Sequence, residues 1–219
     1  FSLILDAAEQ IAEKSLYPIF KEMDRNEPQL ENGIVKVHPK MREIIRQFGA
    51  DGWINSIFPY EEGGQQLPWT IHLPAGFILQ AANYSASVFP FLTTGAANLI
   101  RTFGSTELRD AFTPKMYSGE WQGTMALTEP DAGSSLSDLS TLAVPTAKEG
   151  VYSISGQKIY ISAGDHDACD NIIHLMLARI QGAPAGTKGI SLFVVPKTRI
   201  DGTPNDVLTQ GIYHKMGYK

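Results

Sequence analysis

Residues 121–135 read Trp-Gln-Gly-Thr-Met-Ala-Leu-Thr-Glu-Pro-Asp-Ala-Gly-Ser-Ser, an unusual stretch in which a strand pattern runs directly into a turn. Its first six residues follow the pattern of a strand, and Pro130 ends regular pairing because proline has no N–H to donate. The small residues that follow, 131–135, let backbone N–H groups face outward, which is a geometry that can bind a pyrophosphate. Taken alone, the stretch favours a plain surface loop over such a site.

A second stretch, Gly-Gln-Lys-Ile-Tyr-Ile-Ser-Ala-Gly at residues 156–164, continues a predicted strand. Side chains alternate along a strand, so we expect Tyr160 and Ser162 on one face, about 7 Å apart. An aromatic plane beside a hydroxyl could bind a flat cofactor that accepts a hydrogen bond at a ring nitrogen, such as a flavin. A tyrosine on a half-buried strand is more often a packing residue, so this stretch alone is weak evidence for a site.

The residues before Gly119 have a helical pattern. Apolar side chains recur at intervals of three and four over residues 3–23, and Pro18 is expected to kink or divide that helix. Further helices are predicted at residues 39–49, within 68–99, and at 105–118.

The hydrophobic period changes after Gly119 from about 3.6 to 2, which is typical of strands. Strands are predicted at residues 121–126, 139–147, 151–162, 171–180 and 191–196, with a short one near Val207. Helices followed by strands, without alternation, argue against a Rossmann sheet. The predicted fold is α+β, with an N-terminal all-α domain at residues 1–118 and an antiparallel β-barrel-like domain at residues 119–219.

Composition narrows the classes of partner. The chain has 219 residues, 43% of them hydrophobic, and a formal net charge of −5 without a basic run, which argues against nonspecific nucleic-acid binding. The sequence contains neither a signal-peptide pattern nor an apolar run long enough to span a membrane, so we expect a cytoplasmic protein. Because it begins at Phe1 and stops just after a motif-like stretch, we also expect a piece of a longer protein.

Several standard motifs are missing from the sequence. It contains neither a G-x-G-x-x-G nor a G-x-S-x-G, and residues 182–188 fail as a P-loop because Gly-Lys-Ser/Thr does not follow the spacers. His166 and His174 lie near aspartates, but their spacing does not match a metal site, so no metal is expected. The single cysteine, Cys169, is interpreted as structural.

Together, in order and spacing, the motifs resemble the acyl-CoA dehydrogenase family. The matching segments are Leu-Thr-Glu-Pro-Asp-Ala-Gly-Ser (127–134), Gly-Gln-Lys-Ile-Tyr-Ile-Ser-Ala-Gly (156–164), Ala-Arg (178–179), Lys-Gly-Ile-Ser-Leu-Phe-Val-Val-Pro (188–196) and His-Lys-Met-Gly (214–217). Asp-His-Asp at residues 165–167 and the segment 183–188 look most like the large-subunit branch that includes methylmercaptopropionyl-CoA dehydrogenases.

The resemblance implies FAD as the cofactor, and it implies roles for individual residues. In the first motif, Met125 and Leu127 would lie along the isoalloxazine, Thr128 would bond its pyrimidine edge, and Gly133 and Ser134 would meet the pyrophosphate. Ser134 also occupies the position that touches the acyl-CoA substrate.

In the second motif, the resemblance implies that Tyr160 packs against the flavin ring and that Ser162 donates to flavin N5, with Ile161 among the cofactor contacts. This sequence departs from common family residues at four places. Tyr160 replaces a usual Trp or Phe but keeps the aromatic plane, and Ser162 replaces a usual Thr. Met125 replaces a frequent Tyr, and Ser135 stands where many members have Asp.

The implied activity is FAD-dependent α,β-desaturation of an acyl-CoA thioester, as in fatty acid β-oxidation, with hydride transfer to flavin N5. The family's catalytic carboxylate belongs to a C-terminal helical-bundle domain that this chain lacks, so neither Glu129 nor Glu61-Glu62 is assigned as the base. The chain alone is therefore expected to be inactive. The implied partners are the acyl-CoA substrate, an electron acceptor such as an electron-transfer flavoprotein, and further copies in a homodimer or homotetramer.

Other readings stay open at this point. An acyl-CoA oxidase, a nitroalkane oxidase or a flavin monooxygenase of the same fold would share these motifs. A DNA-associated alkylation-response relative is disfavoured by the acidic balance, and a plain β-rich interaction module would not depend on a flavin.

Overall fold

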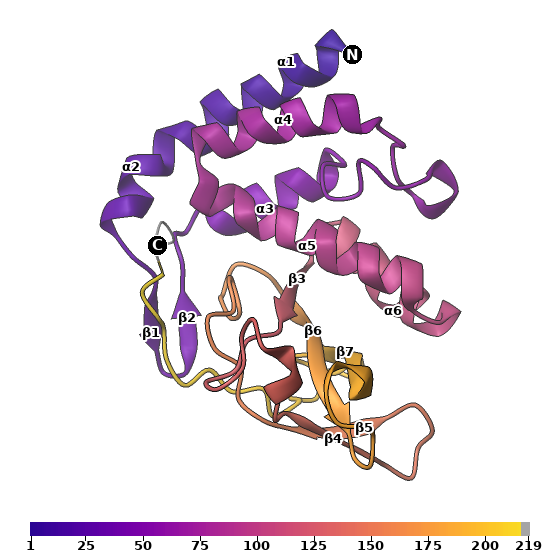
Figure 1. The fold of residues 1–219 in the computed structure, drawn as a ribbon. Helices are drawn as coiled ribbons and strands as arrows, with labels where there is room; N and C mark the ends of the chain where they lie inside the picture. The colour runs from indigo at the N-terminus through magenta and orange to yellow at the C-terminus, as the bar shows by residue number, and fades with distance from the viewer. Residues whose placement is uncertain (216–219) are drawn as a thin grey trace.

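The computed structural model describes residues 1–215, which form a helical layer above a curled β-sheet (Figure 1). The helices are α1 (Ser2–Ile11), α2 (Tyr17–Arg25), α3 (Met41–Ala50), α4 (Trp69–Ala82), α5 (Tyr84–Phe103) and α6 (Thr106–Tyr117). The strands are β1 (Gln29–Glu31), β2 (Ile34–Lys36), β3 (Trp121–Ala126), β4 (Leu142–Pro145), β5 (Tyr152–Ser155), β6 (Asn171–Ile180) and β7 (Ile190–Pro196). Within the described residues, no helix combines the length and apolar character needed to cross a membrane.

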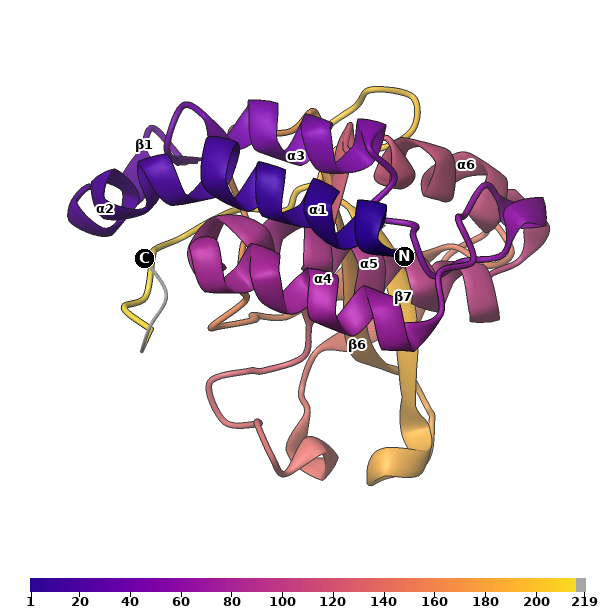
Figure 2. The ribbon, with the colours of Figure 1, turned by 90° about the horizontal axis from the view of Figure 1, so that it is seen from above.

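The predicted order, a helical region followed by a β region, is confirmed. Helix α1 lies along α4, and α5 runs beneath them against the sheet (Figures 1 and 2). One apolar core fills the space between the helices and includes Met41, Phe48 and Leu79, while a second core joins α5 and α6 to the sheet through Phe112 and Ile173.

Pro18 divides the first helix, as predicted. A five-residue π-helix, Ala12–Leu16, separates α1 from α2, and Pro18 occupies the first turn of α2. Proline has no N–H to bond to the carbonyl one turn earlier, so the regular α-helical hydrogen-bonding pattern is interrupted at this point.

The helical half also contains a hairpin that was not predicted. Strands β1 and β2 pair antiparallel, and the two turn residues, Asn32 and Gly33, both have positive φ angles of 51° and 78°. Asn-Gly between short extended segments is a strong signal for such a turn, so the sequence carried the information.

The sheet is built around the long strand β6. Strand β3 pairs with it in parallel, from Trp121↔Asn171 to Ala126↔Met176, and β4 pairs in parallel further along at Leu142↔Arg179. Strand β7 pairs antiparallel with β6, and β5 pairs antiparallel with β4. The sheet is therefore mixed rather than purely antiparallel, because the excursion between β3 and β6 is long enough for a parallel crossover.

Strand boundaries follow the prediction only in part. Residues 121–126 and 171–180 form strands as predicted, and β7 begins one residue early. The predicted strands at residues 139–147 and 151–162 are shorter, at Leu142–Pro145 and Tyr152–Ser155. Val207 lies in irregular chain, and residues 216 and 217 of the His-Lys-Met-Gly segment lie outside the described residues.

Helix α5 packs on β3 so closely that Gly123 has no room for a side chain. A Cβ atom built on Gly123 would lie 2.4 Å from the Cβ of Ala96 and 2.8 Å from the Cε of Met116. The backbone N–H of Gly123 also donates to Thr93 Oγ1 on α5 at 3.1 Å. The glycine thus lets helix and sheet make direct backbone contact.

We predict that Gly123→Ala destabilises the protein by about 1–3 kcal/mol, because α5 and β3 must move apart to admit the methyl group. The check is the thermal unfolding midpoint of the full-length protein. Gly95→Ala is the matched control, since Gly95 is exposed on α5, the helix that packs on Gly123, and has open space around it. That change should be neutral or stabilising. Equal midpoints for the two variants would contradict the prediction.

Candidate functional site

A groove of about 1960 Å³ opens on the inner side of the curled sheet. Strands β6 and β7 form its floor, and the chain after β7 runs along its rim toward the β1–β2 hairpin (Figure 1). Residues 156–165 form one wall, so the second motif faces this space as a continuous segment.

The two motifs meet beside the groove. The Ile159 backbone N–H donates to the Thr128 carbonyl oxygen at 2.9 Å. The first motif folds back on itself, because the Glu129 and Ala132 backbones bond to each other across a tight turn around Pro130. The turn thus directs Glu129 away from solvent and toward the second motif.

The Glu129 side chain is 2% exposed and accepts hydrogen bonds with both oxygens. Lys158 Nζ lies 2.7 Å from Glu129 Oε1 and donates to the Leu127 carbonyl at 3.1 Å. Backbone and hydroxyl groups complete the shell: the Ser140 N–H and Oγ donate to Oε2 at 2.7 Å each, and the Thr141 N–H and Oγ1 donate to Oε1. This carboxylate is a structural anchor shared by three segments.

The pKa shifts of Glu129 and Lys158 agree with a structural role for this carboxylate. Burial alone would raise the pKa of Glu129, but the hydrogen bonds from Lys158, Thr141 and Ser140 outweigh it and lower the pKa to about 2. Burial lowers the pKa of Lys158, while Glu129 opposes that shift. A carboxylate that is ionised and fully engaged in this way is poorly suited to act as a general base at neutral pH.

The second motif does not continue the strand, which corrects the sequence-based expectation. Strand β5 ends at Ser155, and residues 156–164 are irregular, with Tyr160 and Ala163 at positive φ angles of 55° and 48°. The argument from side-chain alternation therefore does not apply to Tyr160 and Ser162. Strand β5 ends opposite Leu142, where its partner β4 begins. Beyond that point, Lys158 and Ile159 bond to the first motif and not to a neighbouring strand.

Tyr160, Ile161 and Ser162 nevertheless all line the groove. The Tyr160 side chain is 46% exposed, and its ring lies 4.8 Å from the ring of Tyr213 in the segment after β7. Lys215 Nζ donates to Ser162 Oγ at 2.9 Å and to the Tyr160 carbonyl at 3.2 Å. An aromatic ring and a hydroxyl thus face one space, although through an irregular backbone.

The candidate residues of the first motif lie next to the groove and do not line it. Met125 is 37% exposed, Leu127 and Thr128 are half-buried, and Gly133 and Ser134 are exposed. A Cβ atom on Gly133 would meet nothing within 4 Å, so the fold itself does not require glycine there. A glycine at this position leaves its backbone N–H open to an external group.

The two histidines have structural partners. His166 Nε2 bonds to Gln122 Oε1 at 2.8 Å, and His174 Nδ1 bonds to Thr124 Oγ1 at 2.8 Å. Burial lowers the pKa of each imidazole to about 4, and burial raises the pKa of the Cys169 thiol to about 12. Over residues 1–215, no cluster of three His, Cys, Asp or Glu side chains could hold a metal ion.

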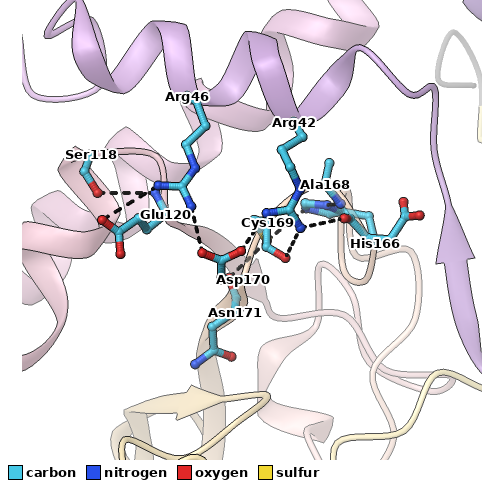
Figure 3. A network of polar contacts seen from close by, with 10 residues as sticks. Arg42, Arg46, Ser118, Glu120, His166, Ala168, Cys169, Asp170 and Asn171 are labelled. Carbon is cyan, nitrogen blue, oxygen red and sulfur yellow. Dashed lines mark hydrogen bonds and ion pairs between the residues drawn. The ribbon is translucent and has the colours of Figure 1, made fainter.

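A polar network that the sequence did not reveal joins α3 to residues 165–171 (Figure 3). Arg42 and Arg46 both bind the Asp170 carboxylate, at 2.6 Å and 2.7 Å. Arg42 also donates to the carbonyl oxygens of Asp167 and Cys169. The signal available in sequence was the i, i+4 spacing of two arginines on one helix face, which by itself reads as a solvated face.

Comparison with known proteins agrees with the motif analysis. Residues 2–120 match the family model described as acyl-CoA dehydrogenase, N-terminal domain, and residues 124–219 match acyl-CoA dehydrogenase, middle domain. A butyryl-CoA dehydrogenase of Syntrophomonas wolfei is 47% identical over 161 residues, covering 71% of this chain and 26% of that protein. A 3-methylmercaptopropionyl-CoA dehydrogenase of Ruegeria pomeroyi is 42% identical over 174 residues, covering 80% and 29%.

Among solved structures, an acyl-CoA dehydrogenase from Bacillus anthracis complexed with FAD has the same fold. It superimposes with a TM-score of 0.72 at 21% identity, covering 90% of this chain and 30% of that one. The chain thus spans less than a third of the length of these relatives.

We predict that stability depends on pH through Glu129. Its folded pKa of about 2 lies below the ordinary 4.5, so its contribution is fully present above about pH 5 and is lost as the pH falls toward 2. The size of this contribution is on the order of 3 kcal/mol. The difference between the urea unfolding midpoints at pH 7 and pH 3 should be smaller in Glu129→Gln than in the wild type. Glu149→Gln, at an exposed turn, is the control, and a Glu129→Gln variant with the pH dependence of this control would refute the assignment.

Proposed function

The chain belongs to the acyl-CoA dehydrogenase family, and we propose that it forms the flavin-facing part of an FAD-dependent enzyme that desaturates an acyl-CoA thioester between its α and β carbons. We place the boundary between the helical and middle β domains at residues 118 and 119. Gly119, with a φ of 71°, follows the end of α6 there and directs the chain into β3.

The observation that carries the proposal is the junction of the two motifs. The Thr128 carbonyl accepts from the Ile159 N–H, and Lys158 is buried against Glu129. Through these contacts, residues 29 and 31 positions apart are held together beside the groove. A binding site assembled from both motifs requires such a junction, whereas a plain surface loop does not.

The residues present fit FAD in chemical kind. Tyr160 offers a half-exposed aromatic ring and Ser162 a hydroxyl on the groove wall, which suit a flat ring with a hydrogen-bonding edge. Gly133 and Ser134 offer backbone N–H groups and a hydroxyl at an exposed turn, which suit a pyrophosphate without a cationic side chain. Met125, Leu127 and Thr128 would flank the ring.

Bound FAD would supply the hydride acceptor for the reaction. We propose that Ser162 Oγ donates to flavin N5, that Ile161 adds a backbone contact, and that Tyr160 packs on the ring. A preorganised hydroxyl at that position would polarise N5 and favour hydride acceptance, because negative charge develops on the ring system as it is reduced. Ser134 would also contact the acyl-CoA.

The catalytic base is proposed to lie outside these 219 residues. Glu129 is committed to Lys158 and to the segment of Ser140 and Thr141.

Electrons would leave through an acceptor such as an electron-transfer flavoprotein, and the complete protein would form a homodimer or homotetramer that completes the flavin site. The pathway would be fatty acid β-oxidation in the cytoplasm.

The test is an absorbance spectrum of the purified full-length protein before and after anaerobic addition of a panel of acyl-CoA esters. The proposal predicts flavin bands that one or more esters bleach. Flavin bands that every ester leaves unchanged would favour a nitroalkane oxidase, a flavin monooxygenase or a DNA-associated relative instead. A protein without flavin that does not take up added FAD would refute the proposal.

We further predict that Ser162→Ala slows flavin reduction by an acyl-CoA about 100-fold, because a donor that stabilises developing charge is lost. Rapid-mixing absorbance under anaerobic conditions measures this rate. Ser153→Ala is the matched control, since Ser153 is exposed on β5 outside the groove, and it should leave the rate unchanged. Equal rates for the two variants would remove Ser162 from the mechanism.

A further inference from the structure

We propose that the loop of residues 165–170 positions Tyr160 and Ser162, and that the Arg42 side chain on α3 fixes the conformation of this loop. The inference rests on the proposed function for the importance of those two side chains. Its structural part, that Arg42 determines the conformation of residues 160–164, is independent of the cofactor.

The segment that carries Tyr160 and Ser162 needs support from outside itself. It lies outside the strands of the sheet, and two of its residues, Tyr160 and Ala163, have left-handed backbone angles. Such angles are unfavourable for residues other than glycine, and they persist only where the surroundings fix them. On the N-terminal side, Lys158 and Ile159 supply that fixation through the first motif.

On the C-terminal side, the fixation comes from the loop of residues 165–170. The Gly164 N–H donates to the Ile161 carbonyl and closes a turn, and Asp165 follows directly. Asp165 binds Lys197 and accepts from Thr209 Oγ1 at 2.6 Å. The residue after the turn is therefore tied to the chain that follows β7.

The rest of the loop is tied to the helical half. Asp167 Oδ1 accepts from the Val37 N–H at 3.2 Å, and Asp167 Oδ2 lies 3.1 Å from Lys36 Nζ. Ala168 is buried within the helical core, and Ala163 packs against the same core. Both ends of the segment from 163 to 168 are thus seated on helices rather than on the sheet.

Arg42 on α3 donates hydrogen bonds to several residues of this loop (Figure 3). Its guanidinium donates to Asp170 Oδ1 at 2.6 Å, to the Asp167 carbonyl at 3.0 Å and to the Cys169 carbonyl at 3.2 Å. Arg46 then holds the other oxygen of Asp170 at 2.7 Å. The planar fork of arginine can serve three acceptors at once, whereas a lysine ammonium is a point charge on a flexible stem.

The exposure of the Arg42 and Asp170 side chains limits how much their ion pair can contribute to global stability. The side chains of Arg42 and Asp170 are about half exposed, and an isolated exposed ion pair contributes little to stability. The contacts of Arg42 with two backbone carbonyls are different, because they specify the path of the loop. We therefore expect a local effect on residues 160–164 that exceeds the effect on global stability.

The experiment compares Arg42→Gln, Arg42→Lys and Asp170→Asn in the full-length protein. Arg101→Gln is the control, because Arg101 forms a partly exposed ion pair with Glu62 at 3.0 Å elsewhere on the helical half. Two quantities are measured: amide hydrogen exchange of residues 160–164 without added FAD, and the FAD dissociation constant by fluorescence titration.

We expect Arg42→Gln to raise exchange at residues 160–164 at least tenfold and to weaken FAD binding threefold to tenfold, with a thermal midpoint close to that of Arg101→Gln. Asp170→Asn should act in the same direction. Arg42→Lys should restore the thermal midpoint but only part of the exchange protection, because it keeps the charge and loses the fork.

Exchange at residues 160–164 that is equal in Arg42→Gln and Arg101→Gln would overturn the proposal. So would exchange that rises equally throughout the chain, since Arg42 would then hold the fold together in general. If the wild type takes up no FAD, the proposed function fails, and the exchange measurement still decides the role of Arg42. Should Arg42→Gln fail to fold, Asp170→Asn and Arg42→Lys carry the same comparison.

Discussion

The buried ion pair between Glu129 and Lys158 is the interaction on which the arrangement of the candidate site depends. The two charges are 2.7 Å apart, with side chains 2% and 7% exposed, and Ser140 and Thr141 satisfy the remaining acceptor capacity of the carboxylate. A buried charge without its partner is costly, so the pair holds the first motif, the second motif and the segment before β4 in one fixed relation. The proposed flavin surface is the exposed side of that junction.

The helical half also contacts the segments that form the wall of the groove. Helix α5 contacts the backbone of β3 at Gly123, and α3 holds the loop of residues 165–170 through Arg42 and Arg46. The groove wall is therefore fixed from both directions, by the junction of the motifs on one side and by the helices on the other. This explains why an irregular segment with two left-handed residues can present defined side chains.

Periodicity and motif order predicted the α+β architecture, the division of the first helix at Pro18 and the exact strands at residues 121–126 and 171–180. They were less informative where long-range contacts decide the backbone. The strand predicted to reach Ser162 ends at Ser155, and beyond it Lys158 bonds to a residue 29 positions earlier in the chain. Likewise, parallel pairing on β6 and the role of Arg42 depend on contacts between distant segments, which local patterns do not encode. Asn32-Gly33 was a local signal that could have revealed the β1–β2 hairpin.

We infer that the Glu129–Lys158 pair assembles the proposed flavin surface. The most direct measurement is the FAD dissociation constant of the full-length protein carrying Lys158→Met, compared with Lys188→Met in the exposed turn before β7. We expect binding to weaken at least tenfold in Lys158→Met and to be unchanged in Lys188→Met. Equal affinities in a folded Lys158→Met protein would mean that the motifs bind FAD without the junction, which would contradict the claim.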